Sequence, residues 1–217
     1  MRKILIASLM LAAAGAAHSA NFSYTGNLAN SNQVLRFDFS VGAPSDVTLR
    51  SYSYAGGVNA AGQTIARGGF DPILSVYNTA SGARLGQNDD ASFGSGVPAD
   101  TDGLRYDVFL SLGSLGAGGY TALLSQYDNF PGETLSTALT GVSGFYNGFV
   151  NTAGVARTSA WAFDILNVNS ATCEPNCSGG NTGGGSTGGG TVPVPGSALL
   201  VLLGGALLGL RRIVSPA

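Results

Sequence analysis

The sequence predicts an all-β protein, a jelly-roll-like antiparallel β-sandwich of about eight strands. Apolar and polar residues alternate with a period of two in several segments, such as 35–41, which is typical of a half-buried strand. Glycine, asparagine, proline and aspartate separate these segments at near-regular intervals, and no helical periodicity runs through them. Short strands divided by frequent turns favour two packed antiparallel sheets.

Eight segments have the composition and the apolar pattern of strands. We expect strands at 22–28, 35–41, 47–54, 73–77, 84–85, 106–112, 120–127 and 161–168. Together they predict one domain over residues 21–170, which is long enough to bury a core. Two glycine-rich stretches, 55–69 and 140–159, remain between strands, and loops of that length in a compact domain are usually functional or mobile.

Residues 1–20 have the organisation of a cleaved signal peptide. Arg2 and Lys3 form a basic start, and the almost wholly apolar run 4–17 follows them. Small residues then stand where a signal peptidase reads the chain, so we expect cleavage after Ser19 or Ala20. The alternative is a first transmembrane helix, which is disfavoured because the apolar run is shorter than the roughly 20 residues that a bilayer requires.

The C-terminal end has three parts in a fixed order. Residues 171–191 contain a cysteine loop and then a stretch of glycine, serine, threonine and asparagine that predicts a flexible linker. Residues 192–217 follow, with Pro193 and Pro195 ahead of an apolar helix that Arg211 and Arg212 close. Basic residues that follow an apolar helix favour the cytoplasmic side of a membrane. We therefore expect the two arginines inside the cell and the body outside. The helix of about 21 Å is short for a hydrocarbon core of about 30 Å, which favours a transient membrane contact.

This order resembles the PEP-CTERM sorting signal, in which a Pro-Glu-Pro motif precedes a short apolar helix and an arginine cluster. Here Val194 stands in place of the glutamate, between Pro193 and Pro195. The resemblance implies a signal peptidase and an exosortase-like sorting enzyme as partners, and a location at the cell surface, the outer envelope or the extracellular matrix. The glycine-rich stretch is also similar to tails sorted by rhomboid-type proteases, and a permanent tail anchor is a third interpretation.

The charge of the body differs from that of the whole chain. Between the two ends there are six arginines, no lysine and twelve acidic residues, so the body has a net charge of −6 against −2 for the whole sequence. Nucleic-acid binding depends on neutralising phosphates with basic side chains, so this balance argues against a nucleic-acid partner. It favours cations as ligands.

The residue inventory excludes most catalytic classes. His18, beside the expected cleavage site, is the only histidine, and Lys3 is the only lysine. Without them the mature body lacks Ser-His-Asp and Cys-His catalysis, histidine-ligated zinc and Schiff-base chemistry. A glycosidase needs only two carboxylates, but Glu133 and Glu174 lie in expected loops and nothing singles out an acid and a base. We therefore expect a protein that is not an enzyme, with a glycoside hydrolase as the third-ranked function.

Cys173 and Cys177 are the only cysteines of the chain. In an exported protein they are expected to form a disulfide that closes a small loop where the chain leaves the domain. Such a short loop should stabilise the fold only weakly. The alternative is a redox or metal-binding pair, for which no further ligand is visible.

Acidic and amide residues gather at the ends of the expected strands. Asp71 begins one strand, Asn88, Asp89 and Asp90 end another, and Asp128 ends a third. Carboxylate and amide oxygens are the ligands that Ca²⁺ takes. The alternative is structural, because aspartate and asparagine are ordinary turn residues whose side chains bind nearby backbone amides.

Several segments resemble the pre-peptidase C-terminal (PPC) β-sandwich, in a PPC-like, DVUA-type group of exported proteins. The segments that carry the resemblance are 70–77, 86–90, 120–129 and 161–165. It implies an accessory module linked to Ca²⁺, with Asn88, Asp89 and Asp90 as ligands and Asp71 and Asp128 in support. The expected role is structural or adhesive, with exopolysaccharide or other matrix proteins as partners.

The alternative function is a carbohydrate- or exopolysaccharide-binding module. Its sugar-stacking surface would comprise six aromatic residues, Tyr52, Tyr54, Tyr127, Phe145, Tyr146 and Phe149. These residue types are also common strand formers and core residues, which is the structural interpretation of the same pattern.

Overall fold

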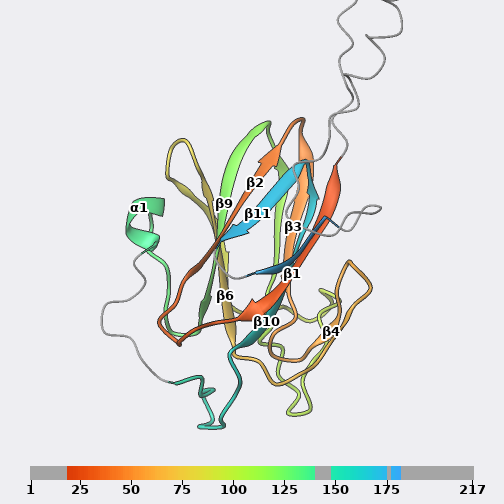
Figure 1. Ribbon diagram of the computed structural model, residues 1–217, viewed down its shortest axis with the longest axis vertical. Coiled ribbons are helices and arrows are strands. Elements are labelled where there is room, and N and C mark those ends of the chain that lie inside the picture. The colour runs from red at the N-terminus through yellow and green to blue at the C-terminus, as the bar shows by residue number, and fades with distance from the viewer. Residues whose placement is uncertain (1–18, 140–147, 175–176, 182–217) are drawn as a thin grey trace, which may run out of the picture.

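In the computed structural model, two five-stranded antiparallel sheets pack face to face (Figure 1). The structure describes residues 19–139, 148–174 and 177–181. The all-β sandwich predicted from the sequence is confirmed. The expected signal peptide up to residue 18, and the expected sorting signal with Pro193, Pro195, Arg211 and Arg212, lie outside the described residues.

Each sheet combines strands from both halves of the chain. In order across the first sheet lie β12 (Ser178–Asn181), β1 (Ala20–Asn27), β10 (Ala160–Val168), β3 (Ser45–Ser51) and β8 (Phe109–Leu115). In order across the second sheet lie β11 (Ser170–Glu174), β2 (Leu35–Val41), β9 (Gly118–Gln126), β6 (Pro72–Asn78) and β7 (Arg84–Asn88). Within these two sheets, consecutive strands alternate between the layers, except for the β6–β7 hairpin.

All eight expected strands are present, and β8 is displaced toward the C-terminus from its expected range. The sequence placed this strand at 106–112, whereas it begins at Phe109. The reason is Asp107, whose carboxylate is fully buried and accepts hydrogen bonds from Ser51 Oγ and from the backbone amides of Tyr54 and Ala55. Because the Asp107 side chain points inward to bind the backbone of Tyr54 and Ala55, residue 107 breaks the apolar–polar alternation that the sequence predicts.

The core lies between the sheets and is rich in aromatic rings. Phe37 on β2 is fully buried, and its ring centroid lies 4.7 Å from that of Phe163 and 5.6 Å from that of Trp161, both on β10. Edge-to-face contacts of this kind add to the free energy of burial. Inward and outward residues alternate strictly along β2, as its sequence predicted.

The long stretch 55–69 is an ordered loop. It contains the small hairpin of β4 (Gly57–Val58) and β5 (Thr64–Ile65). Asp164 of β10 holds this loop: its carboxylate accepts hydrogen bonds from Tyr52 Oη (2.7 Å), Ala60 N (2.8 Å) and Ser23 Oγ (2.5 Å). The stretch 140–159 is described only from residue 148, and the four-residue helix α1 (Leu135–Ala138) precedes it.

The sandwich extends beyond residue 170, the end that the sequence predicts. Strand β11 pairs with β2 in the second sheet, and β12 pairs with β1 in the first. Cys173 and Cys177 are bonded to each other, with 6.0 Å between their Cα atoms, where the chain crosses between the two sheets. The segment expected as a loop and linker therefore contributes an edge strand to each sheet. Within the described residues, no helix has the length and apolar character to cross a membrane.

Candidate functional site

The acidic and amide residues singled out in the sequence lie at the same end of three neighbouring strands. In the second sheet β6 lies between β7 and β9, with Leu74 opposite Asn88 and Pro72 opposite Gln126. Asp71 precedes β6, while Asp89 and Asp90 follow β7 and Asp128 follows β9. We call Asp71, Asn88, Asp89, Asp90 and Asp128 the acidic corner.

Asp71 is the buried member of the acidic corner. Its residue is 5% exposed, and its Oδ1 atom is buried without a hydrogen-bond partner. Burial, followed by the charges of Asp90, Asp89 and Asp107, raises the pKa of Asp71 to about 8, against a smaller opposing effect of Arg157. An unpaired buried carboxylate oxygen is costly, so it is an atom that a proton or a cation would satisfy.

Asn88 shapes the turn that carries Asp89 and Asp90. Its Nδ2 donates to the backbone oxygens of Asp90 (2.7 Å) and Phe109 (3.1 Å), and its Oδ1 accepts from the amide of Asp89 (3.1 Å). The pKa of Asp90 is raised, first because its carboxyl is partly desolvated and then by the charge of Asp89. Asn88 therefore orders the turn, while Asp89 and Asp90 supply its negative charge.

Tyr127 lies among the carboxylates. Its amide donates to the backbone oxygen of Asp71 over 2.7 Å, which ties the end of β9 to the start of β6. Desolvation raises the pKa of Tyr127, and the charges of Asp128, Asp89, Asp71 and Asp90 raise it further. Tyr127 therefore lies within electrostatic range of all four carboxylates of the acidic corner.

The acidic corner is looser than a closed metal cage. Within residues 19–139, 148–174 and 177–181, no three acidic, histidine or cysteine side chains meet closely enough to enclose an ion by themselves. Calcium does not require this, because it also takes backbone carbonyl, amide and water oxygens in flexible geometry. The donor set here is oxygen-only, and the unpaired Oδ1 of Asp71 is an atom of the right kind.

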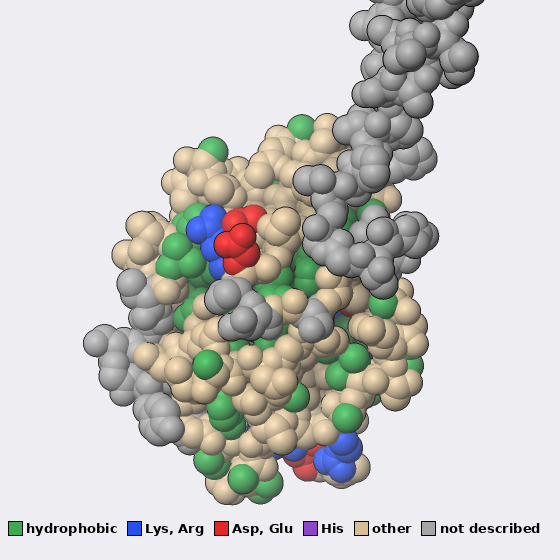
Figure 2. All heavy atoms as spheres, in the orientation of Figure 1, with side chains coloured by type: hydrophobic (Ala, Val, Ile, Leu, Met, Phe, Trp, Pro, Cys, Tyr) green, Lys and Arg blue, Asp and Glu red, His purple; other side chains and the backbone are tan. Residues whose placement is uncertain are grey.

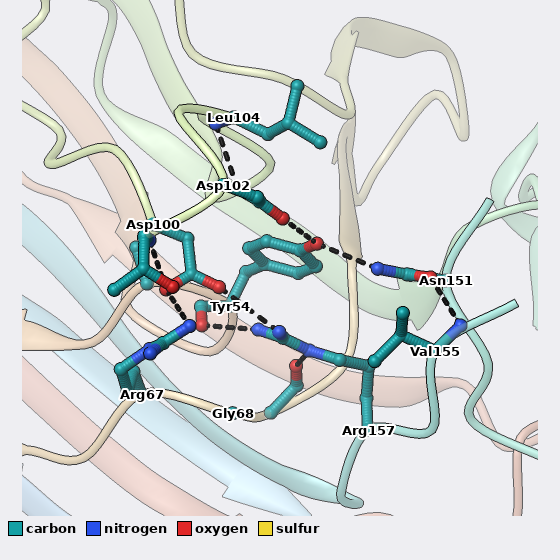
Figure 3. A network of polar contacts seen from close by, with 12 residues as sticks. Tyr54, Arg67, Gly68, Asp100, Asp102, Leu104, Asn151, Val155 and Arg157 are labelled. Carbon is teal, nitrogen blue, oxygen red and sulfur yellow. Dashed lines mark hydrogen bonds and ion pairs between the residues drawn. The ribbon is translucent and has the colours of Figure 1, made fainter. Parts of the chain in front are cut away.

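Beside the acidic corner lies a polar network that the sequence did not predict (Figure 3). Asp100, whose side chain is 1% exposed, makes ion pairs with Arg67 (2.6 Å) and Arg157 (3.1 Å). Burial opposes the ionisation of Asp100, but the bonds from Arg67, the Thr101 amide and Arg157 outweigh it and hold its pKa below the ordinary value. The network joins the loops 52–69, 89–108 and 148–159, which gather at the lower end of the sandwich in Figure 1.

Arg157 fixes the backbone that leads into Asp71. Its Nε donates to the Gly69 carbonyl (2.9 Å), and its terminal nitrogen donates to the Tyr54 carbonyl (2.6 Å). Its side chain is 8% exposed. Nothing in the local sequence indicates this role, because Arg157 stands alone in a long polar loop and its partners lie about 50 to 100 residues away.

The sugar-stacking surface is not formed as expected. Tyr52 and Tyr54 are buried, so neither ring is free to stack on a sugar. Phe149 packs against Phe70, with 5.8 Å between ring centroids, while Phe145 and Tyr146 lie outside the described residues. Tyr127 is partly exposed and packs edge-on against Phe130.

A hollow of about 340 Å³ lies between the loop 52–66 and the strands β1 and β10. Its lining contains no charged residue and comprises Thr25, Gly26, Asn27, Tyr52, Ser53, Thr64, Ile65, Ala66, Ala160 and Trp161. Figure 2 shows a face on which charged side chains form only small groups among uncharged and hydrophobic surface. The lining suits a neutral, hydroxyl-bearing ligand better than an ion.

Comparison with known proteins gives no relative: no model of a protein family, no characterised protein and no solved structure matches the chain.

Proposed function

We propose that this chain is a non-catalytic, exported β-sandwich module with a structural or adhesive role, whose acidic corner binds Ca²⁺. The observation that carries the calcium site is the buried Oδ1 of Asp71, which has no partner and lies within the electrostatic reach of Asp89 and Asp90. A divalent cation would satisfy this oxygen and offset the repulsion among the carboxylates.

Calcium bound at the acidic corner would act as a clamp. The carboxylates come from the start of β6 and the ends of β7 and β9, so one ion would hold three strand ends together. A ligand that binds only the folded state stabilises it by RT ln(1 + [L]/Kd), about 2.7 kcal/mol at a hundredfold excess over Kd. The site would then stabilise the fold where free calcium is abundant, as it is outside cells.

Terbium luminescence tests this site. Tb³⁺ replaces Ca²⁺ at oxygen sites and emits when a nearby tyrosine is excited, and Tyr127 lies among the carboxylates. We expect emission from the purified chain that excess Ca²⁺ quenches, and we expect Asp89→Ala to remove both the emission and the heat of calcium binding. Tyr127→Phe is the matched control, because it should reduce emission and leave the calorimetric calcium affinity unchanged. Emission that calcium does not displace would overturn the site.

Export and sorting are supported by the sequence ends together with the position of β1. Strand β1 begins at Ala20, so cleavage after Ser19 would release the signal peptide and leave this strand whole. Mass spectrometry of the mature protein tests the sorting proposal. We expect a new N-terminus near Ala20 and loss of Arg211 and Arg212, whereas an intact C-terminus would contradict processing.

The order of the eight core strands, β1-β10-β3-β8 facing β2-β9-β6-β7, supports the jelly-roll-like assignment.

The second candidate function, exopolysaccharide binding, is favoured by the neutral hollow. A polymer of neutral sugars offers hydroxyl groups to the side chains of Thr25, Asn27 and Thr64. We expect a glycan array to give hits that Thr64→Val weakens and that Asp89→Ala leaves unchanged. An array without hits, or hits indifferent to Thr64→Val, would count against this candidate.

A further inference from the structure

Two side chains that line the neutral hollow have a buried polar atom without a partner. Ser53 and Trp161 are each 2% exposed, and both belong to the lining between the loop 52–66 and the strands β1 and β10. Ser53 Oγ and Trp161 Nε1 have no hydrogen-bond partner among the residues that the structure describes. Nearly all buried polar groups in folded proteins are paired, so each unpaired atom requires an explanation. A molecule held in the hollow would supply both missing partners.

The two unpaired atoms define the chemistry of that molecule. The indole N–H of Trp161 can only donate, so its partner must offer an acceptor, whereas the Ser53 hydroxyl can donate or accept. Three further polar side chains of the lining, those of Thr25, Asn27 and Thr64, also combine donors and acceptors. A cation would offer no acceptor to the indole, whereas a ligand with several hydroxyl groups offers donors and acceptors together. The lining therefore matches a sugar.

A buried carboxylate next to the hollow favours a neutral sugar over an acidic one. Tyr52, which lines the hollow, donates from its hydroxyl to Asp164 over 2.7 Å, and Asp164 is fully buried. Burial raises the pKa of Tyr52, and the hydrogen bond and the charge of Asp164 raise it further, ahead of the opposing effect of Arg50. The lining itself contains no basic residue, so a uronic acid would bring a second carboxylate toward Asp164 with no positive charge in the lining to pair it.

We propose that the hollow holds one neutral sugar ring of a polysaccharide and that Trp161 and Ser53 bind this ring, which rests on the exopolysaccharide-binding candidate above. The indole N–H of Trp161 donates to a sugar oxygen, and the Ser53 hydroxyl forms a hydrogen bond with a sugar hydroxyl. The volume of about 340 Å³ is at the small end of the range for ligand pockets, which suits a single ring rather than a long stretch of polymer. Selection against acidic sugars follows from the charge of Asp164.

The indole resonance of Trp161 tests the proposal directly, because Trp161 is the only tryptophan of the chain. The purified full chain, labelled with ¹⁵N, therefore gives a single side-chain indole signal in a ¹H–¹⁵N NMR spectrum. Neutral tetrasaccharides of glucose, mannose and galactose are added in turn, with tetragalacturonate as the acidic counterpart. We expect at least one neutral tetrasaccharide to shift the signal to saturation, and tetragalacturonate at the same concentration to leave it in place.

Two serine variants on one segment separate binding from folding. Ser53→Ala removes a hydroxyl that has no partner among the described residues, so it should leave the urea midpoint of the free protein unchanged and weaken sugar binding by about fivefold. Ser51 is also buried, but its hydroxyl donates to Asp107 (2.9 Å) and accepts from the Val108 amide (2.8 Å). Ser51→Ala, the matched control, should therefore lower the urea midpoint and leave the sugar affinity within about twofold.

Results that contradict the proposal differ in what they say about the exopolysaccharide-binding candidate. If the protein gives hits on a glycan array but no neutral tetrasaccharide moves the indole signal, the sugar binds elsewhere, and only the proposal for the hollow is overturned. An array without hits together with an unmoved indole signal would overturn both. Equal shifts with tetragalacturonate would overturn the selection for neutral sugars, and equal affinities of Ser53→Ala and the wild type would show that Ser53 does not bind the ring.

Discussion

The guanidinium of Arg157 lies over the ring of Tyr54, with its Cζ atom 3.6 Å from the ring centroid. The same guanidinium binds the Tyr54 carbonyl and the carboxylate of Asp100. On the other side, the Tyr54 hydroxyl donates to Asp102 (2.9 Å) and accepts from Asn151 (3.0 Å). Arg157 and Tyr54 therefore form the centre of the network that joins three loops and holds the backbone before Asp71.

Replacing Arg157 by alanine should destabilise the fold strongly. It would leave the buried Asp100 with the half-exposed Arg67 as its remaining ion-pair partner, and the carbonyls of Tyr54 and Gly69 would each lose a donor. Breaking a buried ion pair from one side costs about 3–5 kcal/mol, and we expect about 3 kcal/mol because Arg67 remains. Urea unfolding measures this.

The matched control is Arg84→Ala. Arg84 also pairs with a carboxylate, at 2.6 Å, but its partner Glu133 is 81% exposed. An exposed ion pair contributes about 0–1 kcal/mol, so the free energy of unfolding should fall much less in the control than in the Arg157 variant. Equal losses would show that the network does not stabilise the loops.

Asp71 should make the stability of the calcium-free protein fall as the pH rises. Its pKa of about 8 in the folded state lies above the ordinary value of 3.8, so between these values the folded state holds a proton that the unfolded state does not. Linkage then lowers the free energy of unfolding with increasing pH, by up to about 1.4 kcal/mol per unit.

Asp71→Asn should flatten this dependence and raise the stability at pH 7 in chelator. Urea unfolding at pH 5 and pH 7 measures the slope for both proteins. Asp128→Asn, which changes an exposed member of the acidic corner, should leave the slope as it is. A slope that is the same in the wild type and in Asp71→Asn would show that Asp71 is already ionised in the folded protein.

Asp164 should be needed to hold the β4–β5 hairpin on the sandwich. Asp164→Ala removes the acceptor of Tyr52 Oη, Ser23 Oγ and the Ala60 amide, at a cost of about 2 kcal/mol for the unpaired groups. We expect limited proteolysis to cut the variant within 57–66. Asp46→Ala, which changes an exposed aspartate on β3, is the control and should resist cleavage like the wild type.

The Cys173–Cys177 bond should contribute modestly to stability. It closes a ring of five residues, and loop-closure entropy gives about 2 kcal/mol for so short a ring, well below the value for long loops. The double variant Cys173→Ala/Cys177→Ala should therefore fold, and its midpoint in urea should fall by about 1 M. Failure of this variant to fold would show that β11 and β12 are held in place mainly by the bond.

The eight core strands could be predicted because burial on one face imposes alternation, which Leu35 to Val41 display in full. Strand β12 could not, because Ser178–Asn181 carries no apolar pattern. Strand β11 alternates over only five residues, with Ala171 and Cys173 toward the core, which is too short a signal to separate it from a loop. The acidic corner could be predicted in part, because antiparallel pairing brings the start of β6 beside the ends of β7 and β9. The network of Arg157 and Asp100 could not, because it depends on contacts between loops far apart in the sequence.

The most direct test of the calcium site is the melting temperature of the purified chain in Ca²⁺ and in chelator. We predict that Ca²⁺ raises the melting temperature of the wild type by about 5 °C or more. Asp71→Asn should melt above the wild type in chelator, because the amide is neutral without the uptake of a proton on folding. It should show no further rise with Ca²⁺, because the substitution weakens the site. A wild-type melting temperature that is the same in Ca²⁺ and in chelator would contradict the account.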